Sequence, residues 1–211
     1  MADSKKVLEI IQAIASKIEE EKDLLTKLDQ PIGDSDHGIN MARGFGEVEK
    51  KLPTLEGKDI GTILKTVGMT LVSTVGGASG PLYGSAYLKA GMASAGKETL
   101  SLDEFLSVLK TAIEAVQQRG KSTVEEATML DAMVPSLNAM EAAAAEGAEA
   151  KAVLEAGVKA AWAGAEHTKD LIATKGRASY VGERGLGHQD PGATSSLLTL
   201  EAIRDFYAEN K

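Results

Sequence analysis

The sequence predicts an all-α protein of about eight helices. Apolar residues recur at intervals of three and four in segment after segment, which is the spacing of one face of a helix. No window shows sustained alternation of apolar and polar residues between turn residues, as half-buried strands require. Ala, Leu, Glu and Lys dominate the composition, and these residues favour helices over strands.

The individual helices follow from this spacing in chain order. The first is predicted by Val7, Ile10, Ile11, Ile14 and Ile18, which share one helix face. Further helices are expected over residues 39–52, 60–71, 82–95, 102–116, 128–145, 151–174 and 193–208.

Single residues refine these elements. Ser101, followed three residues later by Glu104, is the capping-box signature for the helix over residues 102–116. Pro135 lies inside a predicted helix and is expected to kink it. Trp162 and Met92 lie at helical spacing among aliphatic residues, so both are expected in the core. For His167, beside charged neighbours on a helix, we expect a plain surface position.

Composition restricts the classes of function. The chain has 211 residues, 31 acidic and 23 basic, and a formal net charge of −8. Nucleic acid is not an expected partner, because binding to phosphate backbones needs clustered Lys and Arg. Cysteine is absent, which excludes thiol catalysis and fits the reducing cytoplasm, where we expect this protein. Charged residues interrupt the Ala-rich stretches, so no membrane span is expected, and the short spacers predict one domain over residues 1–211.

A first loop concentrates acidic side chains between two predicted helices. Asp29, Asp34, Asp36 and His37 fall within nine positions. Carboxylates this close repel one another, and Mg²⁺, which prefers oxygen ligands, would relieve that repulsion. The alternative is a solvated turn in which Asp36 or Ser35 merely caps the next helix.

A second loop, residues 75–84, consists mainly of small residues. It leads through Ser79 to Pro81, which fits the first turn of a helix. Bare backbone amides before a helix N-terminus attract phosphate, and a serine hydroxyl adds a donor. The alternative is a flexible connection between helices.

A third loop, residues 175–192, is long and rich in glycine. It carries Lys175, Arg177 and Arg184 in an otherwise acidic protein, so phosphate charge can be met there. A loop of this kind can close over a ligand as a lid. The alternative is a surface loop without function.

Four motifs occur together in an order and spacing that resemble one family. They are Gly33-Asp34-Ser35-Asp36-His37-Gly38, Gly77-Ala78-Ser79-Gly80-Pro81-Leu82, Thr128-Met129-Leu130-Asp131, and Gly176-Arg177-Ala178-Ser179-Tyr180 through Asp190-Pro191-Gly192. Together they look like the L subunit of bacterial dihydroxyacetone kinase. The likeness runs from about Asp29 to Thr194.

The resemblance implies a barrel of eight antiparallel amphipathic helices, with nucleotide and Mg²⁺ held at one end. It implies that Asp29, Asp34 and Asp36 ligate two Mg²⁺ ions, and it makes Asp34, Asp36 and His37 the candidate catalytic residues. The positions that match nucleotide contacts are His37, Gly38, Ile39, Asn40, Ala78, Ser79, Gly120, Met129, Arg177, Asp190, Pro191 and Gly192. The lid would span about residues 175–190.

The family's activity sets the functional expectation. ADP would stay bound as a coenzyme, receive phosphate from a phosphohistidine on the M subunit, and pass it to dihydroxyacetone held on the K subunit. Two alternatives are a nucleotide-binding regulatory module that binds a transcription factor, and an ATP-dependent kinase module for another small acceptor. One departure stands out, because Glu125-Glu126-Ala127 replaces the family's usual Gly-Asp-Lys. The change is expected to alter the ADP affinity or the partner that touches this rim; the alternative is a neutral surface change.

Overall fold

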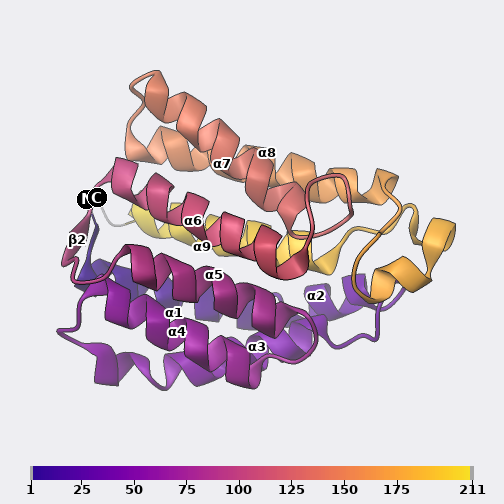
Figure 1. The fold of residues 1–211 in the computed structure, drawn as a ribbon, viewed down its shortest axis with the longest axis horizontal. Coiled ribbons are helices and arrows are strands. Elements are labelled where there is room, and N and C mark those ends of the chain that lie inside the picture. Colours follow the sequence, from indigo (N-terminus) through magenta and orange to yellow (C-terminus); the bar gives the residue numbers. More distant parts are fainter. Residues whose placement is uncertain (1, 210–211) are drawn as a thin grey trace.

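The computed structural model describes residues 2–209, and these form nine α-helices, so the all-α prediction is confirmed (Figure 1). The helices are α1 Ser4–Glu20, α2 Lys22–Asp29, α3 His37–Glu49, α4 Ile60–Thr74, α5 Ser79–Ala93, α6 Leu102–Gly120, α7 Leu130–Ala145, α8 Ala150–His167 and α9 Pro191–Glu209. Short 3-10 helices span Leu52–Leu55, Thr168–Asp170, Arg177–Tyr180 and Gly182–Gly185. Two short strands, β1 Ala2–Asp3 and β2 Thr99–Leu100, pair antiparallel beside the N-terminus.

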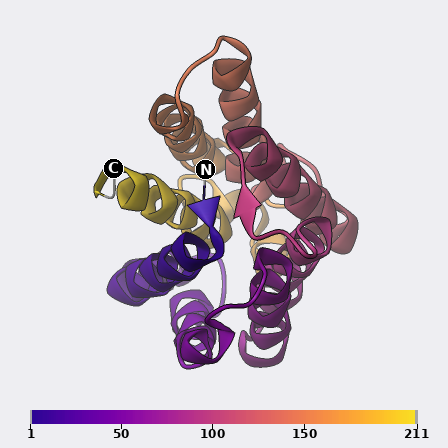
Figure 2. The same cartoon turned by 90° about the vertical axis from the view of Figure 1, so that its left-hand side faces the viewer.

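Eight of these helices form a closed ring. The ring begins with α1, and α3 packs on α1. From α4 to α9, each helix packs on the one before it in the chain, and α9 packs on α1 and so closes the ring. Figure 2 shows the ring nearly end-on. The ninth helix, α2, lies outside this order against α3 and α9. It was not predicted, because eight residues with Leu25 as their one buried apolar side chain give no helical period.

Glycine allows α4 and α5 to approach closely. A Cβ on Gly68 would lie 2.7 Å from the Leu88 nitrogen, and one on Gly61 would lie 2.6 Å from the Ala95 Cα. Larger residues at these positions would push the helices apart. The pairing fixes the N-terminus of α5 relative to α4.

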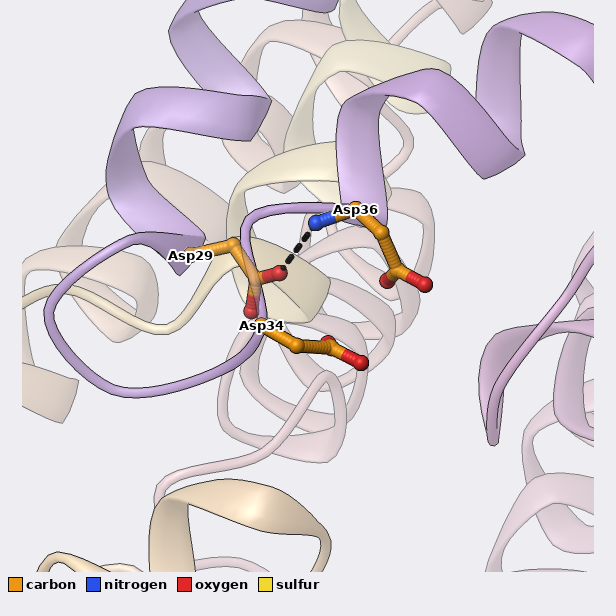
Figure 3. A group of neighbouring side chains, drawn as sticks. All are labelled: Asp29, Asp34 and Asp36. Carbon is orange, nitrogen blue, oxygen red and sulfur yellow. Dashed lines mark hydrogen bonds between the residues drawn. The ribbon is translucent and has the colours of Figure 1, made fainter.

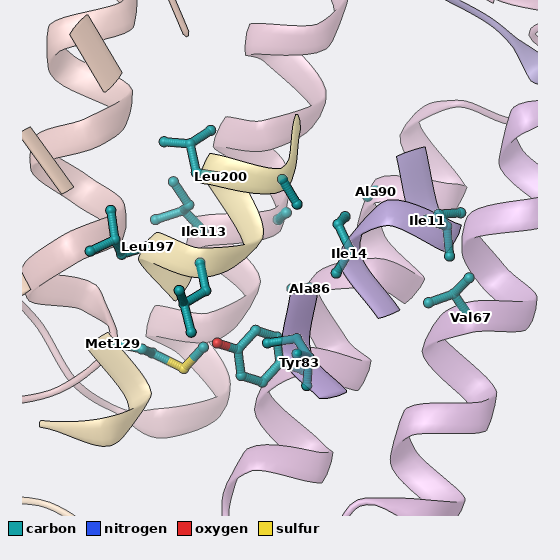
Figure 4. Close-up of a cluster of buried hydrophobic side chains, with 14 of the residues drawn as sticks. Ile11, Ile14, Val67, Tyr83, Ala86, Ala90, Ile113, Met129, Leu197 and Leu200 are labelled. Atoms are coloured by element: carbon teal, nitrogen blue, oxygen red, sulfur yellow. The ribbon is translucent and has the colours of Figure 1, made fainter. Parts of the chain in front are cut away.

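The core occupies the centre of the ring (Figure 4). Ile11 and Ile14 of α1, Val67 of α4 and Ile113 of α6 are among its buried side chains. A cavity of about 220 Å³ lies among mainly apolar residues of these helices. Tyr83 of α5 is also buried in the core, with its hydroxyl directed toward α9.

Two core predictions are wrong. Trp162 of α8 and Met92 of α5 are each 57% exposed. The inner face of α8 consists of small and branched residues, among them Ala161 and Ala165, and Trp162 lies outside that face. Helical spacing alone does not distinguish a residue on the buried apolar face from an adjacent apolar residue that faces solvent.

Helix boundaries also differ from the prediction. The helix expected over residues 151–174 ends at His167, and α7 begins at Leu130. α7 continues through Pro135, which cannot donate to the Asp131 carbonyl. Gly164 packs against that carbonyl so closely that a Cβ there would overlap it. Among residues 2–209, no helix is both long and apolar enough to cross a bilayer.

Candidate functional site

A second cavity, of about 130 Å³, lies at the end of the ring away from the chain termini. Its lining residues are Asp29, Ile32, Asp34, Asp36, His37, Asn40, Gly76, Gly77, Ala78, Ser79, Lys175, Gly176, Arg177, Ala178, Asp190 and Pro191. They come from the end of α2, from the segments between the helices and from the first residues of α3, α5 and α9. Three helix N-termini therefore meet at one cavity, and each contributes the partial positive charge of its helix dipole.

The acidic cluster forms where α2 ends and α3 begins (Figure 3). One carboxylate oxygen from each of Asp29, Asp34 and Asp36 lies within 4.8 Å of the others. Asp29 Oδ2 accepts hydrogen bonds from the backbone nitrogens of Asp36, at 2.9 Å, and His37, at 3.2 Å. The Asp36 carboxylate does not cap α3. The capping alternative for Asp36 is therefore wrong.

Gly33 controls how Asp29 is placed. A Cβ on Gly33 would lie 1.9 Å from Asp29 Oδ1, so only glycine leaves room for this carboxylate. The Gly33 nitrogen donates to the Asp29 carbonyl oxygen at 2.6 Å. Carboxylate oxygens gathered this closely are the donor set that Mg²⁺ prefers, so the residues present fit such an ion.

Positive charge reaches the same cluster from the loop that follows α8. Arg177 Nε lies 2.8 Å from Asp34 Oδ2. Lys175 Nζ lies 3.5 Å from Glu126 Oε1 at the base of that loop. The predicted lid segment thus contacts the acidic cluster through Arg177, near the start of the segment.

His37 lies in a buried network of hydroxyl groups. Its Nδ1 is 3.1 Å from Ser79 Oγ and its Nε2 is 3.0 Å from Ser195 Oγ. The Tyr83 hydroxyl lies 2.7 Å from Ser195 Oγ and 2.9 Å from Ser196 Oγ. Burial lowers the pKa of His37, although the nearby carboxylates of the cluster act in the opposite direction. Through these contacts the imidazole joins the N-termini of α3 and α5 to α9.

Asp190 stands at the start of α9. Its Oδ2 accepts a hydrogen bond from the Ala193 nitrogen at 2.7 Å, and its own nitrogen donates to Thr168 Oγ1 at 2.9 Å. Burial, with smaller contributions from Asp131 and Asp29, raises the pKa of Asp190 to about 7. This carboxyl group is therefore near half-protonation at neutral pH.

The loop before α7 contains Glu125, Glu126 and Ala127, the residues expected to depart from the family pattern. Glu125 and Ala127 have left-handed backbones, with φ of 66° and 53°. The Asp131 carboxylate accepts hydrogen bonds from the nitrogens of Glu125 and Thr128. Glu125 in turn lies 3.1 Å from Nε2 of His167, which is exposed on the surface as expected.

Glu126 links this loop to the base of the predicted lid. Its carboxylate accepts hydrogen bonds from Ser122 Oγ, at 2.7 Å, the Thr123 nitrogen, at 2.8 Å, and Thr174 Oγ1, at 2.9 Å. These bonds, led by the one from Ser122, lower the pKa of Glu126 to about 2. Glu126 is thus part of the local structure of this rim.

The structure brings ten of the fifteen predicted site residues to the cavity wall: Asp29, Asp34, Asp36, His37, Asn40, Ala78, Ser79, Arg177, Asp190 and Pro191. The other five lie nearby or elsewhere. Gly192 and Met129 pack against each other, and Gly38 packs against α2. Ile39 is 51% exposed, and Gly120 ends α6 beside Leu82.

Sequence reasoning missed other residues of the site. Gly76 and Gly77 were recognised only as part of a loop, although both line the cavity. Tyr83 was likewise included only as part of that loop, and Ser195 was missed because it has the pattern of an ordinary helix residue. No local signal could have identified them, because their contact with His37 depends on how the ring closes.

Comparisons with known proteins agree with this arrangement. The model of the DAK2 domain matches residues 31–205. The chain is 44% identical over 183 residues to the ADP-binding subunit DhaL of a PEP-dependent dihydroxyacetone kinase from Escherichia coli, covering 87% of each chain. It is 46% identical over 187 residues to the corresponding DhaL subunit of kinase 1 from Listeria innocua, covering 89% of this chain and 88% of the relative.

A solved structure shows the same fold. The native dihydroxyacetone kinase of C. freundii superposes with a TM-score of 0.75 at 25% identity, covering 97% of this chain and 35% of that longer chain. Because the family model spans most of the sequence and the DhaL subunits match nearly end to end, the chain belongs to the DAK2 domain family, in the group of ADP-binding dihydroxyacetone kinase subunits.

Proposed function

We propose that this chain holds ADP and two Mg²⁺ ions in the polar cavity and serves as the phosphoryl carrier of a dihydroxyacetone kinase. The phosphohistidine M subunit phosphorylates the bound ADP, and the phosphoryl group then passes to dihydroxyacetone on the K subunit in the cytoplasm. The observation that supports this most is the meeting of three helix N-termini with three carboxylates at one cavity. N-termini favour phosphate and carboxylates favour the cation that accompanies it.

The residues divide this work by chemistry. Asp29, Asp34 and Asp36 would hold the Mg²⁺ ions, which neutralise charge on phosphoryl oxygens when bound. Ser79 and the amides at the start of α5 supply neutral donors to phosphate. The hydrogen bond between His37 Nδ1 and Ser79 Oγ fixes the position of the Ser79 hydroxyl group.

The remaining predicted positions take supporting parts in this proposal. Arg177 brings a guanidinium to the phosphate end of the cavity, and the segment over about residues 175–190 closes it as a lid. Gly192 and Met129 bring the start of α9 against the start of α7. The closed ring supports treating the chain as one domain.

The division between subunits is supported by the nature of the other cavity. That larger space is lined almost wholly by apolar side chains and offers little hydrogen bonding to a small polyol. This lining agrees with the proposal that the K subunit holds the acceptor.

Replacing Asp34 by Asn tests the proposal. The amide keeps the size of the side chain but removes a negative ligand, so phosphoryl transfer should fall at least about 100-fold, as for loss of a positioned catalytic group. Transfer is measured as dihydroxyacetone phosphate formed in a coupled assay with the K and M subunits. Asp23→Asn, on an exposed position of α2, is the matched control and should keep wild-type activity. Near wild-type transfer by Asp34→Asn would refute the assignment.

A further inference from the structure

The side chain of Asn40 faces the polar cavity and is held by a residue outside it. Asn40 lies one turn into α3 and is 6% exposed. Its Oδ1 accepts a hydrogen bond of 2.7 Å from Arg43 Nη2. A guanidinium has donors only, so the atom of the carboxamide that faces Arg43 must be the oxygen. The amide nitrogen is then fixed on the other side.

That nitrogen has no hydrogen-bond partner among residues 2–209. Within the same residues, Ser94 Oγ is the one side-chain polar atom that is both sealed from solvent and unpartnered. Asn40 Nδ2 is therefore accessible, and the open space next to Asn40 is the cavity that it lines. A nearly buried amide thus keeps two unused N–H donors toward the proposed phosphate site.

Gly76 confines the carboxamide from a second direction. A Cβ on Gly76 would lie 2.9 Å from both Nδ2 and Oδ1 of Asn40, so the amide lies directly over the Gly76 Cα. Arg43 is itself fixed, because its Nε donates a 2.9 Å hydrogen bond to the Thr74 carbonyl at the end of α4. Arg43 therefore ties the cavity-facing side of α3 to the loop that begins after Thr74.

We propose that Arg43 is a positioning residue for the anionic ligand: it locks the Asn40 carboxamide so that Nδ2 donates to a phosphate oxygen of the bound nucleoside diphosphate. The inference rests on the proposed function and adds to it a residue that does not line the cavity. Without Arg43, the carboxamide can rotate by 180° and present its oxygen, which repels phosphate. The guanidinium acts through Asn40 and not by its own charge.

A double-mutant cycle on ADP affinity tests this. Affinity is measured by titration calorimetry in excess Mg²⁺ for the wild type, Arg43→Met, Asn40→Ala and the double variant. Asn40→Ala should weaken binding about 10- to 100-fold, as expected for loss of a hydrogen bond to a charged group, and Arg43→Met about fivefold. The double variant should bind as Asn40→Ala does, because Arg43 has nothing left to orient.

Three further variants separate orientation from charge and from folding. Asn40→Asp keeps the shape but replaces N–H donors by an anionic oxygen, so it should bind ADP more weakly than Asn40→Ala. Arg43→Lys retains a donor for Oδ1 and should recover most of the affinity lost in Arg43→Met. Lys50→Met removes one positive charge at the far end of α3 and should leave the affinity unchanged. Melting temperatures of all variants report whether the fold is intact.

The outcomes distinguish the inference from the proposed function. Wild-type protein that does not bind ADP would overturn both. Wild-type binding with additive losses in the cycle would overturn the positioning role alone, since Arg43 would then act by charge or by structure. Equal affinity of Asn40→Asp and wild type would also overturn it, because Nδ2 would then not contact the phosphate.

Discussion

At the residue scale, the acidic cluster depends on a glycine as much as on its carboxylates. Asp29 is fixed by two backbone nitrogens of the next helix, and Gly33 leaves the space that its second oxygen occupies. The sequence could predict the cluster because its members lie within eight positions of one another. It could not predict the need for Gly33, which follows from the close approach of two parts of one loop.

A substitution of Gly33 by Ala should therefore impair Mg²⁺-dependent ADP binding. The new Cβ overlaps Asp29 Oδ1 and must displace this carboxylate, and a displacement of about 1 Å can cost about 100-fold in a positioned site. Calorimetric titration of ADP with and without Mg²⁺ measures the loss. Gly46→Ala is the control, because a Cβ there meets no atom within 4 Å; its affinity should be unchanged and its stability up to about 1 kcal/mol higher. Equal affinities for both variants would mean that Asp29 is not a ligand.

Other residues of the site have no local signature. Ser195 and Tyr83 meet His37 only because α9 packs back onto the first helices. Arg43 is an ordinary charged residue on a helix until the end of α4 is placed beside it. Such contacts are set by tertiary structure, and periodicity contains no information about them.

At the element scale, the long helices were predictable and their ends were less so. Apolar periodicity located α1, α4 and α6, and the capping box of Ser101 is confirmed with both of its hydrogen bonds. The end of α8 was placed seven residues too late, since residues 168–174 contain no Gly or Pro to mark a break. The sequence also did not show how the base of the lid is held, because Thr174 is fixed there by Glu126, which lies in another loop.

Glu126→Gln should loosen this base. The carboxylate accepts from Ser122, Thr123 and Thr174 on both oxygens, whereas an amide has one acceptor oxygen and must lose part of this set. A loss of about 1 kcal/mol corresponds to about fivefold faster hydrogen exchange, and we expect it in residues 172–187. Exchange is followed by mass spectrometry. Glu114→Gln, exposed on α6, should leave this segment unchanged, and unchanged exchange in Glu126→Gln would show that the lid base is held otherwise.

At the scale of the whole molecule, closure of the ring brings together carboxyl groups that are far apart in the sequence. Asp190, Asp131 and Asp29 are distant in the chain, yet burial and the two neighbouring carboxylates together raise the pKa of Asp190. Ring closure was expected only from the family resemblance, because no local pattern says that α9 returns to α1. The same closure buries the hydroxyl network behind His37.

The raised pKa of Asp190 makes folding stability depend on pH. This carboxyl group has an ordinary value of 3.8 and a folded value of about 7. Between these values the unfolded chain has released a proton that the folded chain retains, so the contribution of Asp190 to stability falls as pH rises through this window. Urea unfolding in EDTA at pH 4.5, 6 and 8 should show the free energy of the wild type falling relative to Asp190→Asn. A difference between the two proteins that does not change with pH would contradict this account.

The central claim is that three aspartates and three helix N-termini form one site for Mg²⁺ and ADP. Native mass spectrometry of the intact folded protein tests it most directly, after incubation with ADP and Mg²⁺ and again after EDTA. The account predicts a complex whose added mass equals one ADP with Mg²⁺, and loss of that complex on chelation or in the Asp34→Asn variant. A chain that stays free of nucleotide at saturating ADP and Mg²⁺, or that binds ADP equally well in EDTA, would contradict it.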